Sequence, residues 1–474
     1  MKIVTVGGVS SLIAILLGVG AAVPTDASAQ TLTSLHSFPA APGDGALPQG
    51  GLIADATGNL YGTTLGGGIG NGYGTVFKLT PAGTESVLHA FTGGDGAFPG
   101  NTLLADAAGN LYGTTAGGGL NNYGTVFKLT LNSDGTYSHS VLYNFAGYPS
   151  DGQAPAGLIA DAAGNLYGTT VAGGENACVD YGCGTVFKLT ANSDGTYSET
   201  VLHNFTGGSD GQYPFGRLIA DAAGNLYGTT FYGGGSSCDL GCGTVFELKP
   251  NLDGTYSETL LYSFTGDRDG VAPTAGLLAD AAGNLYGTTS EGGGSRYCLT
   301  GCGTVFTLTL NLDGTYSERV LHRFDGSDGQ TPYAGLIADA AGNLYGTTYS
   351  GGVILPACGG SCGTVFILMP TGTLAVLHSF NFSDGAQPAA GLIADAAGNL
   401  YGTTSFGGTN NYGTVFKLAV ATTFNGVPGT ANCTSQSISF LATEFGGIAH
   451  AATALGFTSV TDLQNVVVAY CTGH

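Results

Sequence analysis

Ten cysteines carry the clearest chemical signal in this 474-residue sequence. Eight form close pairs, four or five residues apart, and the last two lie far apart near the C-terminus. Close thiols either bind a metal ion or oxidise to disulfides. A tetrahedral metal site needs several reduced thiolates, whereas an even, paired count is typical of exported proteins. We therefore predict five disulfides and no metal site: Cys178–Cys183, Cys238–Cys242, Cys298–Cys302, Cys358–Cys362 and Cys433–Cys471.

Seven Asp-Gly pairs recur along the chain, and their carboxylates allow two interpretations. They could form a ring around a central axis that binds a cation or a polyhydroxyl ligand. Alternatively, each pair makes the same tight turn, with the aspartate bonded to local backbone. Recurrence in every repeat favours the turn. The aspartates are Asp44, Asp95, Asp151, Asp210, Asp269, Asp328 and Asp384.

Five histidines share one position in the repeat, and two further repeats carry Tyr143 and Tyr262 there. A metal ligand or catalytic base would not exchange with tyrosine, so packing or surface filling is the better interpretation. We find no serine-elbow motif, no phosphate loop, no cofactor motif and no unique set of acids and bases. The histidines are His36, His89, His203, His322 and His378.

Three phrases repeat seven times at steps of 50 to 60 residues. The first is Gly-Leu-Ile-Ala-Asp-Ala-x-Gly-Asn-Leu-Tyr-Gly-Thr-Thr, the second Gly-Thr-Val-Phe, and the third Leu-x-x-Phe. In the third repeat we expect strands at 158–160, 165–170, 184–189 and 197–205, because these segments are short, β-rich and separated by turn residues. Four short strands per repeat at this period predict a β-propeller.

The order of the phrases indicates how the ring closes. The first copy to appear is the fourth-strand phrase ending at Phe38, and the last repeat, 391–418, has only three strands. The N-terminal strand therefore completes the last blade and removes an open sheet edge. We predict an all-β fold, a seven-bladed β-propeller of four-stranded blades closed by the N-terminal strand.

The run Asp-x-x-Gly-Asn-Leu-Tyr-Gly-Thr-Thr, then Gly-Gly, then Gly-Thr-Val-Phe-Lys-Leu, resembles the GloVer tandem repeat of "choice-of-anchor" exported bacterial proteins. The resemblance covers about residues 31 to 418. It implies a cell-surface or extracellular location and a variable C-terminal anchor, but no established activity.

Composition and the two ends of the chain set the location. Eleven basic against 32 acidic residues give a net charge of −21, which disfavours nucleic acid. The apolar run 3–23, followed by Pro24 and Ala27-Ser28-Ala29, predicts a signal peptide over 1–29. The alternative is a retained membrane anchor, which the glycines in the run disfavour. With the paired cysteines, this favours an extracellular, cell-surface or periplasmic protein.

The tail departs from the repeat pattern. We predict a propeller over 30–418, a linker over 419–434 and a small α-helical module over 435–474, because apolar residues there recur at helical spacing. The Cys433–Cys471 disulfide would staple this module. Anchoring, partner docking and structural capping of the propeller are its alternative roles.

The loops between the second and third strands supply the candidate binding site. Three have 8 or 9 residues, whereas those with cysteine pairs, in blades 3 to 6, have 12 to 14. We expect a non-enzymatic module that binds an extracellular glycan or a cell-surface protein there, with tyrosine platforms above an acidic floor. The alternatives are a polysaccharide- or polymer-active enzyme that uses the channel mouth, and a structural coat protein. Candidate ligand contacts are Tyr181, Phe231, Tyr232, Tyr297, Tyr349, Ile354, Leu355, Asp210, Asp269 and Asp328.

Overall fold

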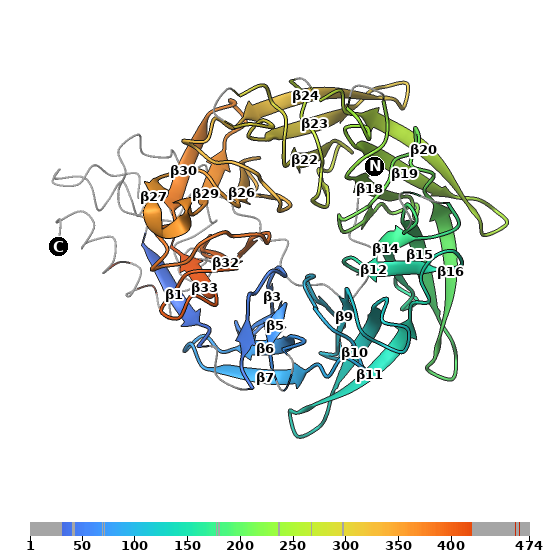
Figure 1. Ribbon diagram of the computed structural model, residues 1–474, viewed down its shortest axis with the longest axis horizontal. Coiled ribbons are helices and arrows are strands. Elements are labelled where there is room, and N and C mark those ends of the chain that lie inside the picture. The colour runs from blue at the N-terminus through green and yellow to red at the C-terminus, as the bar shows by residue number, and fades with distance from the viewer. Residues whose placement is uncertain are drawn as a thin grey trace.

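The computed structural model describes residues 31–39, 43–68, 70, 72–176, 178, 181–235, 238–266, 268–295, 298–419, 460 and 464. Seven four-stranded antiparallel blades stand around a central opening (Figure 1), which confirms the all-β, seven-bladed propeller. The predicted signal peptide lies outside the described residues. So do the linker and the helical module, apart from Ala419, Val460 and Gln464. No helix among the described residues is long and apolar enough to cross a membrane.

Each blade has four strands, which lie side by side in order from the axis to the rim. The innermost strands are β3 (Ile53–Ala54), β8 (Leu104–Ala105), β13 (Ile159–Ala160), β17 (Ile219–Ala220), β21 (Leu278–Ala279), β25 (Ile337–Ala338) and β31 (Ile393–Ala394). The second strands are β4 (Leu60–Thr64), β9 (Leu111–Thr115), β14 (Leu166–Gly173), β18 (Leu226–Thr230), β22 (Leu285–Thr289), β26 (Leu344–Thr348) and β32 (Leu400–Thr404).

The outer half of each blade is longer and more regular. The third strands are β6 (Thr75–Leu79), β10 (Thr125–Leu131), β15 (Thr185–Ala191), β19 (Thr244–Pro250), β23 (Thr304–Leu310), β29 (Thr364–Leu368) and β33 (Thr414–Leu418). The outermost strands are β7 (Glu85–Ala90), β11 (Tyr137–Asn144), β16 (Tyr197–Asn204), β20 (Tyr256–Ser263), β24 (Tyr316–Arg323), β30 (Leu374–Ser379) and, for the last blade, β1 (Leu32–Ser37).

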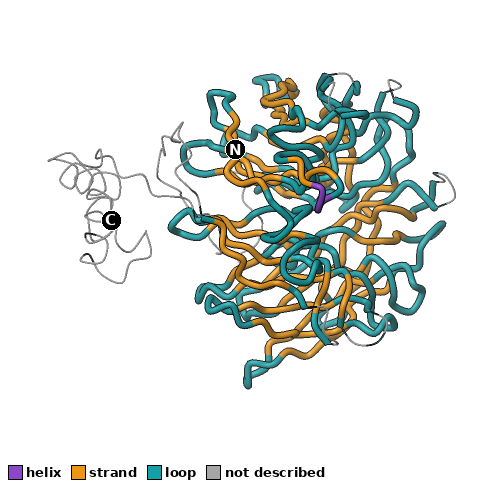
Figure 2. Tube along the Cα trace, turned by 60° about the vertical axis from the view of Figure 1, so that its left-hand side comes forward, coloured by secondary structure: helices purple, strands orange, loops and turns teal. Residues whose placement is uncertain are grey.

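Short pairings extend the loops on one face. β2 (Gly45–Ala46) pairs with β5 (Gly66–Gly67), and β12 (Gly152–Pro155) pairs with the end of β14. The longest loop forms β27 (Ile354–Leu355), the 3-10 helix η1 (Pro356–Cys358) and β28 (Gly360–Ser361). Figure 2 shows η1 in purple, among the teal loops that surround the orange strands. Because strands alternate in direction, the loops after the second strands share a face with the connections between blades.

The repeated phrases follow from packing inside a blade. A methyl group on Gly228 would come within 2.5 Å of the Phe246 ring, so the Tyr-Gly-Thr-Thr strand needs glycine beside the Gly-Thr-Val-Phe strand. Thr230 and Thr244 share a buried hydrogen bond of 2.7 Å between their hydroxyls. Every blade has the same glycine–phenylalanine contact and the same threonine pair. The repeated phrases therefore consist mainly of residues that pack inside the blade.

Phenylalanines hold neighbouring blades together. The phenylalanine after each outermost strand contacts the third-strand phenylalanine of the next blade edge to face, at 5.1 to 5.3 Å between centroids. All of these rings are fully buried. Edge-to-face pairs add stability beyond the area that they bury. The pairs are Phe38–Phe77, Phe91–Phe127, Phe145–Phe187, Phe205–Phe246, Phe264–Phe306, Phe324–Phe366 and Phe380–Phe416.

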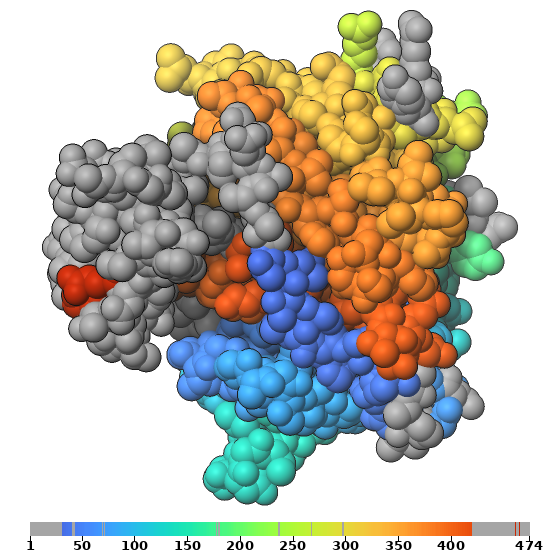
Figure 3. All heavy atoms as spheres, turned by 90° about the vertical axis from the view of Figure 1, so that its left-hand side faces the viewer, coloured from blue at the N-terminus to red at the C-terminus, as the bar shows by residue number. Residues whose placement is uncertain are grey.

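The ring closes as the order of the phrases predicts. Strand β1 pairs antiparallel with β33, with Leu32 opposite Leu418 and Ser37 opposite Thr414. Figure 3 shows the blue N-terminal segment against the orange-red strands of the last blade. The Thr403 hydroxyl also donates to the Gly50 carbonyl oxygen across the closure, 3.4 Å away. The equivalent threonines bond the next blade elsewhere in the ring, so the closure repeats an ordinary blade interface.

Candidate ligand site at the channel mouth

The innermost strands surround a cavity of about 820 Å³ on the axis. Its wall consists mainly of the repeated Leu-Ile-Ala segments and the glycines that precede them. The residues that line it include no aspartate, glutamate, histidine or cysteine, and Arg217 is the one charged residue among them. A largely apolar wall with one charged group is typical of a site that fixes a ligand by a few polar contacts.

Arg217 breaks the sevenfold symmetry of the channel. It precedes β17, where five other blades have glycine and one has Thr102. Its aliphatic stem crosses to the neighbouring blade and lies against Gly157, where a Cβ atom would come within 3.2 Å of the arginine. The Nε atom donates to the Leu158 carbonyl oxygen at 2.7 Å. Gly157 therefore provides the space that this arginine needs.

The Arg217 guanidinium has no carboxylate partner among the described residues. The side chain is partly exposed within the cavity, and burial lowers its pKa from the ordinary value. An arginine remains charged in proteins even so. A cation that is removed from water without an anion nearby costs stability. The position is therefore suited to an anionic group from outside the chain.

Two exposed aromatic rings line the same cavity as the arginine. Phe215 and Tyr333 occupy the same place in blades 4 and 6, immediately after the proline of the connection, and 43% and 39% of their surfaces are exposed. Each ring contacts another edge to face: Phe215 contacts Phe231 at 5.5 Å, and Tyr333 contacts Tyr349 at 5.3 Å. The other blades have smaller or polar residues in this place, namely Gln49, Gly100, Ala156, Thr274 and Ala389.

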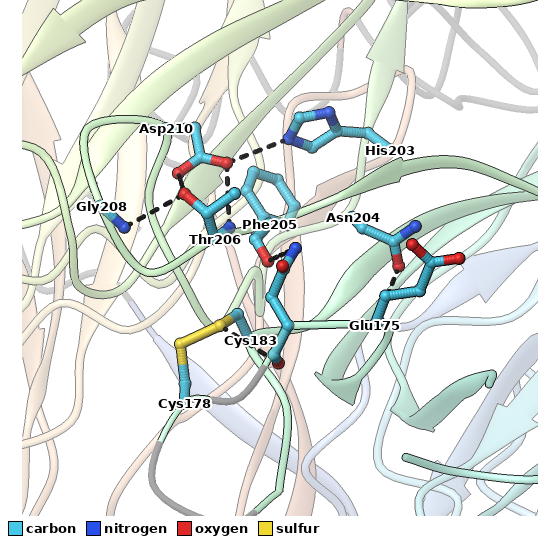
Figure 4. Close-up of a disulfide and its surroundings, with 10 residues drawn as sticks. Glu175, Cys178, Cys183, His203, Asn204, Phe205, Thr206, Gly208 and Asp210 are labelled. Atoms are coloured by element: carbon cyan, nitrogen blue, oxygen red, sulfur yellow. Dashed lines mark hydrogen bonds and ion pairs between the residues drawn. A yellow bond between two sulfur atoms is a disulfide. The ribbon is translucent and has the colours of Figure 1, made fainter. Parts of the chain in front are cut away.

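Four of the predicted disulfides are present: Cys178–Cys183, Cys238–Cys242, Cys298–Cys302 and Cys358–Cys362. The fifth, Cys433–Cys471, lies outside the described residues. Four disulfides are consistent with an exported protein, because the cytoplasm keeps thiols reduced. Figure 4 shows the first of them beside the connection that follows β16.

The clipped loops contact the connections at the channel mouth through backbone hydrogen bonds. The second cysteine of each pair accepts a hydrogen bond through its carbonyl oxygen from the connection that enters the next blade. Tyr213 donates to Cys183 at 2.9 Å, and Thr331 donates to Cys302 at 2.9 Å. These donors lie two residues before Phe215 and Tyr333 in the chain. The clipped loops of blades 3 and 5 thus contact the two connections that carry the exposed rings. The same bond forms to Tyr73, Tyr123 and Tyr412 in the blades without a disulfide, so it belongs to the repeat.

The Asp-Gly carboxylates do not line the cavity. Six of them contact the histidine or tyrosine of the outermost strand, and Asp44 accepts from the Gly45 amide at 2.6 Å. Asp269 accepts from the Tyr262 hydroxyl at 2.9 Å, and Asp328 lies 2.7 Å from His322 Nε2. Asp210 lies 3.4 Å from His203 Nε2 and accepts from the Thr206 amide (Figure 4). The expected acidic floor, formed by Asp210, Asp269 and Asp328, is therefore not part of the cavity wall.

The same contact explains why histidine and tyrosine alternate in the outermost strand. Both residue types present a polar atom to the aspartate of the following Asp-Gly pair. Tyr143 donates to Asp151 at 2.9 Å, whereas His378 Nε2 lies 3.0 Å from Asp384. Packing alone, as the sequence suggested, is thus an incomplete explanation of this position.

The predicted aromatic contacts fall into two groups. Phe231 and Tyr232 contact each other at 4.4 Å and, with Tyr349, belong to the rings around the mouth. Tyr181 and Ile354, by contrast, are exposed on the loops, at 65% and 82%. Leu355 packs against the core between blades 6 and 7. Tyr297 lies outside the described residues.

Sequence analysis missed Arg217, Phe215 and Tyr333. Their signal is visible only when the seven repeats are compared position by position, since each of the three departs from its equivalents. Residues that recur in all blades build the blade, whereas an asymmetric site consists of departures from the repeat.

The fold and the cavity define a seven-bladed β-propeller with one asymmetric arc at its channel mouth, across blades 4 to 6. The chain belongs to the Gloeobacter/Verrucomicrobia repeat family, whose model matches residues 17–239 and 236–427. This confirms the resemblance seen in the sequence. No curated protein matches the chain.

Solved structures with some similarity include a gluconolactonase from Xanthomonas campestris, at 16% identity and a TM-score of 0.39. The match covers 67% of this chain and 86% of that one. A luciferin-regenerating enzyme matches at 17% identity and a TM-score of 0.38, over 66% of this chain and 88% of that one. At this distance, neither match transfers an activity to this protein.

Proposed function

We propose that this protein is an exported binding module that holds an acidic glycan at the channel mouth, on the clipped-loop face of blades 3 to 6. The observation that carries the proposal is Arg217, a cation without a protein anion, in a cavity rimmed by Phe215 and Tyr333. In this assignment residues 1–29 direct export, and 435–474 form a separate C-terminal module.

The chemistry of these side chains matches such a ligand. Arginine binds carboxylates through two parallel N–H donors, and the Nη atoms of Arg217 have no partner among the described residues. Aromatic rings stack on the apolar faces of sugars. The exposed rings of Phe215 and Tyr333 would be held in position by the rings behind them, which belong to Phe231, Tyr232 and Tyr349.

The charge of the whole protein narrows the ligand class. A net charge of −21 repels a long polyanion, whereas the local field of Arg217 acts over short distances. The favoured ligand therefore has one or a few carboxylates among neutral sugars.

Binding without turnover is the better interpretation of this cavity. The described residues that line it provide no carboxylate, imidazole or thiol for general acid–base or nucleophilic chemistry. An enzyme that acts on extracellular polymers is the alternative. Release of shorter products during the binding assay would favour it.

A comparison of matched oligosaccharides tests the proposal. The mature protein should bind uronic-acid oligosaccharides in calorimetry and bind neutral analogues more weakly. Phe215→Ala and Tyr333→Ala should each weaken binding about tenfold, as expected for loss of a ring worth 1–2 kcal/mol. Leu120→Ala, on the exposed loop of blade 2 outside the proposed site, is the control. Equal binding by all variants, or no binding to any glycan, would contradict the proposal.

A further inference from the structure

A second departure from the repeat lies at the outer rim, between blades 1 and 2. His89 of β7, Asp95 of the following connection and His139 of β11 place their ligand atoms within 4.8 Å of one another. The two histidine rings stack in parallel, with centroids 4.0 Å apart and planes 4° apart. Two imidazoles and one carboxylate form a donor set typical of a divalent transition-metal site.

Each donor is already oriented. Asp95 accepts through Oδ1 from the amide and hydroxyl of Thr92, at 2.8 and 2.9 Å. Its Oδ2 atom lies 3.0 Å from His89 Nε2. His139 Nε2 is buried and has no hydrogen-bond partner. Glu85, Glu199, Glu258 and Glu318 at the equivalent position also have a buried oxygen without a partner, but only His139 offers a nitrogen beside a second imidazole.

The protonation states suit metal binding. Burial lowers the pKa of His89, although the Asp95 carboxylate opposes the shift. Burial, followed by the nearby His89, lowers the pKa of His139 to about 4. Both rings are therefore neutral at pH 7, and the His139 Nε2 atom can offer a lone pair. The His89 Nε2 atom donates its proton to Asp95, so a metal ion that binds this nitrogen takes the place of that proton, which leaves to solvent. His89 and Asp95 keep 19% and 23% of their surfaces exposed, so an ion can enter and water can complete its coordination.

This donor set occurs once among the described blade interfaces. In every blade the residue equivalent to His139 lies opposite a leucine of the third strand, and this leucine recurs in all seven repeats. The fold does not need histidine there, because the other blades have Glu85, Glu199, Glu258, Glu318, Leu374 and Leu32.

We propose that His89, Asp95 and His139 bind one divalent transition-metal ion of the zinc, nickel or copper class. Ligand bonds to zinc of about 2.0–2.2 Å require the three atoms to lie closer to one another than the 4.8 Å within which they lie here. The ion would cross-link the outermost strands of blades 1 and 2, on the rim and away from the channel.

Calorimetric titration of tag-free, chelator-treated mature protein with Zn²⁺ tests this site. We expect one saturable site, with a nickel response and no response to Ca²⁺, which prefers oxygen ligands. His139→Leu installs the residue of blades 6 and 7, and His89→Tyr installs that of blades 2 and 4, so both should fold normally. Each should weaken Zn²⁺ binding at least tenfold.

His322→Tyr is the matched control, because His322 pairs with Asp328 but its neighbouring blade has Leu374. This variant should bind Zn²⁺ as the wild type does. The proposal is overturned if the wild type binds no Zn²⁺ at a single site. It is also overturned if His139→Leu and His89→Tyr both bind as tightly as the wild type. Neither result bears on the channel mouth.

Discussion

Arg217 donates through Nε to the carbonyl oxygen of Leu158, 2.7 Å away, and so joins the inner edges of blades 4 and 3. This bond fixes the guanidinium against the channel wall. It also leaves the Nη atoms without a protein acceptor among the described residues. A side chain held in place with unused donors is preorganised for a ligand, since little entropy remains to be lost on binding.

Replacement of this arginine should cost little stability. Arg217→Gly restores the residue of five other blades, and it removes a partly buried charge that has no partner ion. We expect the free energy of unfolding to change by less than about 1 kcal/mol, because the gain offsets the flexibility of glycine. Denaturant unfolding measures this change. A loss of several kcal/mol would show that the arginine serves the fold.

Closure of the ring depends on β1 and the phenylalanine after it. Phe38 is fully buried and packs edge to face on Phe77 of the first blade. Phe38→Ala should therefore cost about 3–5 kcal/mol, the usual cost of a large buried ring. Deletion of 32–38 should lower the melting temperature further, because blade 7 then has an open edge. Ser34→Ala, on the exposed side of β1, is the control. A truncated protein that melts like the full-length one would refute the closure.

Each disulfide should stabilise its loop and the neighbouring connection. Replacement of Cys178 and Cys183 by serine should lower the free energy of unfolding by about 2 kcal/mol. The effect is small because the bridge closes a short loop, which removes little entropy from the unfolded chain. The exchange should also make the connection around Tyr213 more sensitive to protease, because Tyr213 bonds Cys183. Unfolding under non-reducing conditions and limited proteolysis measure the two effects. Unchanged values for both would show that the clip has no structural role.

Stability should fall as the pH rises through the range of the inter-blade glutamates. Burial, and then the charge of Asp151, raises the pKa of Glu199 from 4.5 to about 7. Burial and Asp269 raise that of Glu318 to about 7 as well. The folded protein therefore binds more protons than the unfolded chain between pH 4.5 and 7. Their contribution is complete below pH 4.5 and is lost by about pH 7.

Glutamine at both positions removes these titrations. The double variant Glu199→Gln, Glu318→Gln should therefore show a flatter dependence of melting temperature on pH than the wild type over the same range. Glu175, on an exposed loop, is the control position. If the melting temperature depended on pH in the same way for the double variant and the wild type, Glu199 and Glu318 would not be the source of this pH dependence.

Most of the fold is predictable from the sequence, because every blade is built by the same local contacts. The glycine beside Phe246 and the pair Thr230–Thr244 recur in equivalent form in every blade, so the phrases that contain them mark the strands. The closure of the ring was also predictable from the sequence. The fourth-strand phrase that ends at Phe38 precedes the first complete repeat, and only its pairing with the last blade leaves no open sheet edge. The four close disulfides followed from spacing alone.

The candidate site was only partly predictable. The clipped loops indicated the arc of blades 3 to 6, which also carries Arg217, Phe215 and Tyr333, and the binding role of this arc remains a prediction. Asp210, Asp269 and Asp328 lie outside the cavity wall, because they contact the outermost strand, and a linear pattern does not reveal that contact. Arg217 and His139 were overlooked for a different reason. Each is a single change within a repeated phrase, and its meaning depends on neighbours such as Leu158 and His89 that only the closed ring brings into contact.

The most direct test of the central claim compares an acidic oligosaccharide with its methyl ester on wild-type protein and Arg217→Gly. We expect the wild type to bind the free acid at least tenfold more tightly than the ester, because a charged hydrogen-bonded pair contributes about 1.5–3 kcal/mol. Arg217→Gly should bind both forms equally weakly. Retention of the wild-type preference by Arg217→Gly would place the acidic group elsewhere and contradict the account.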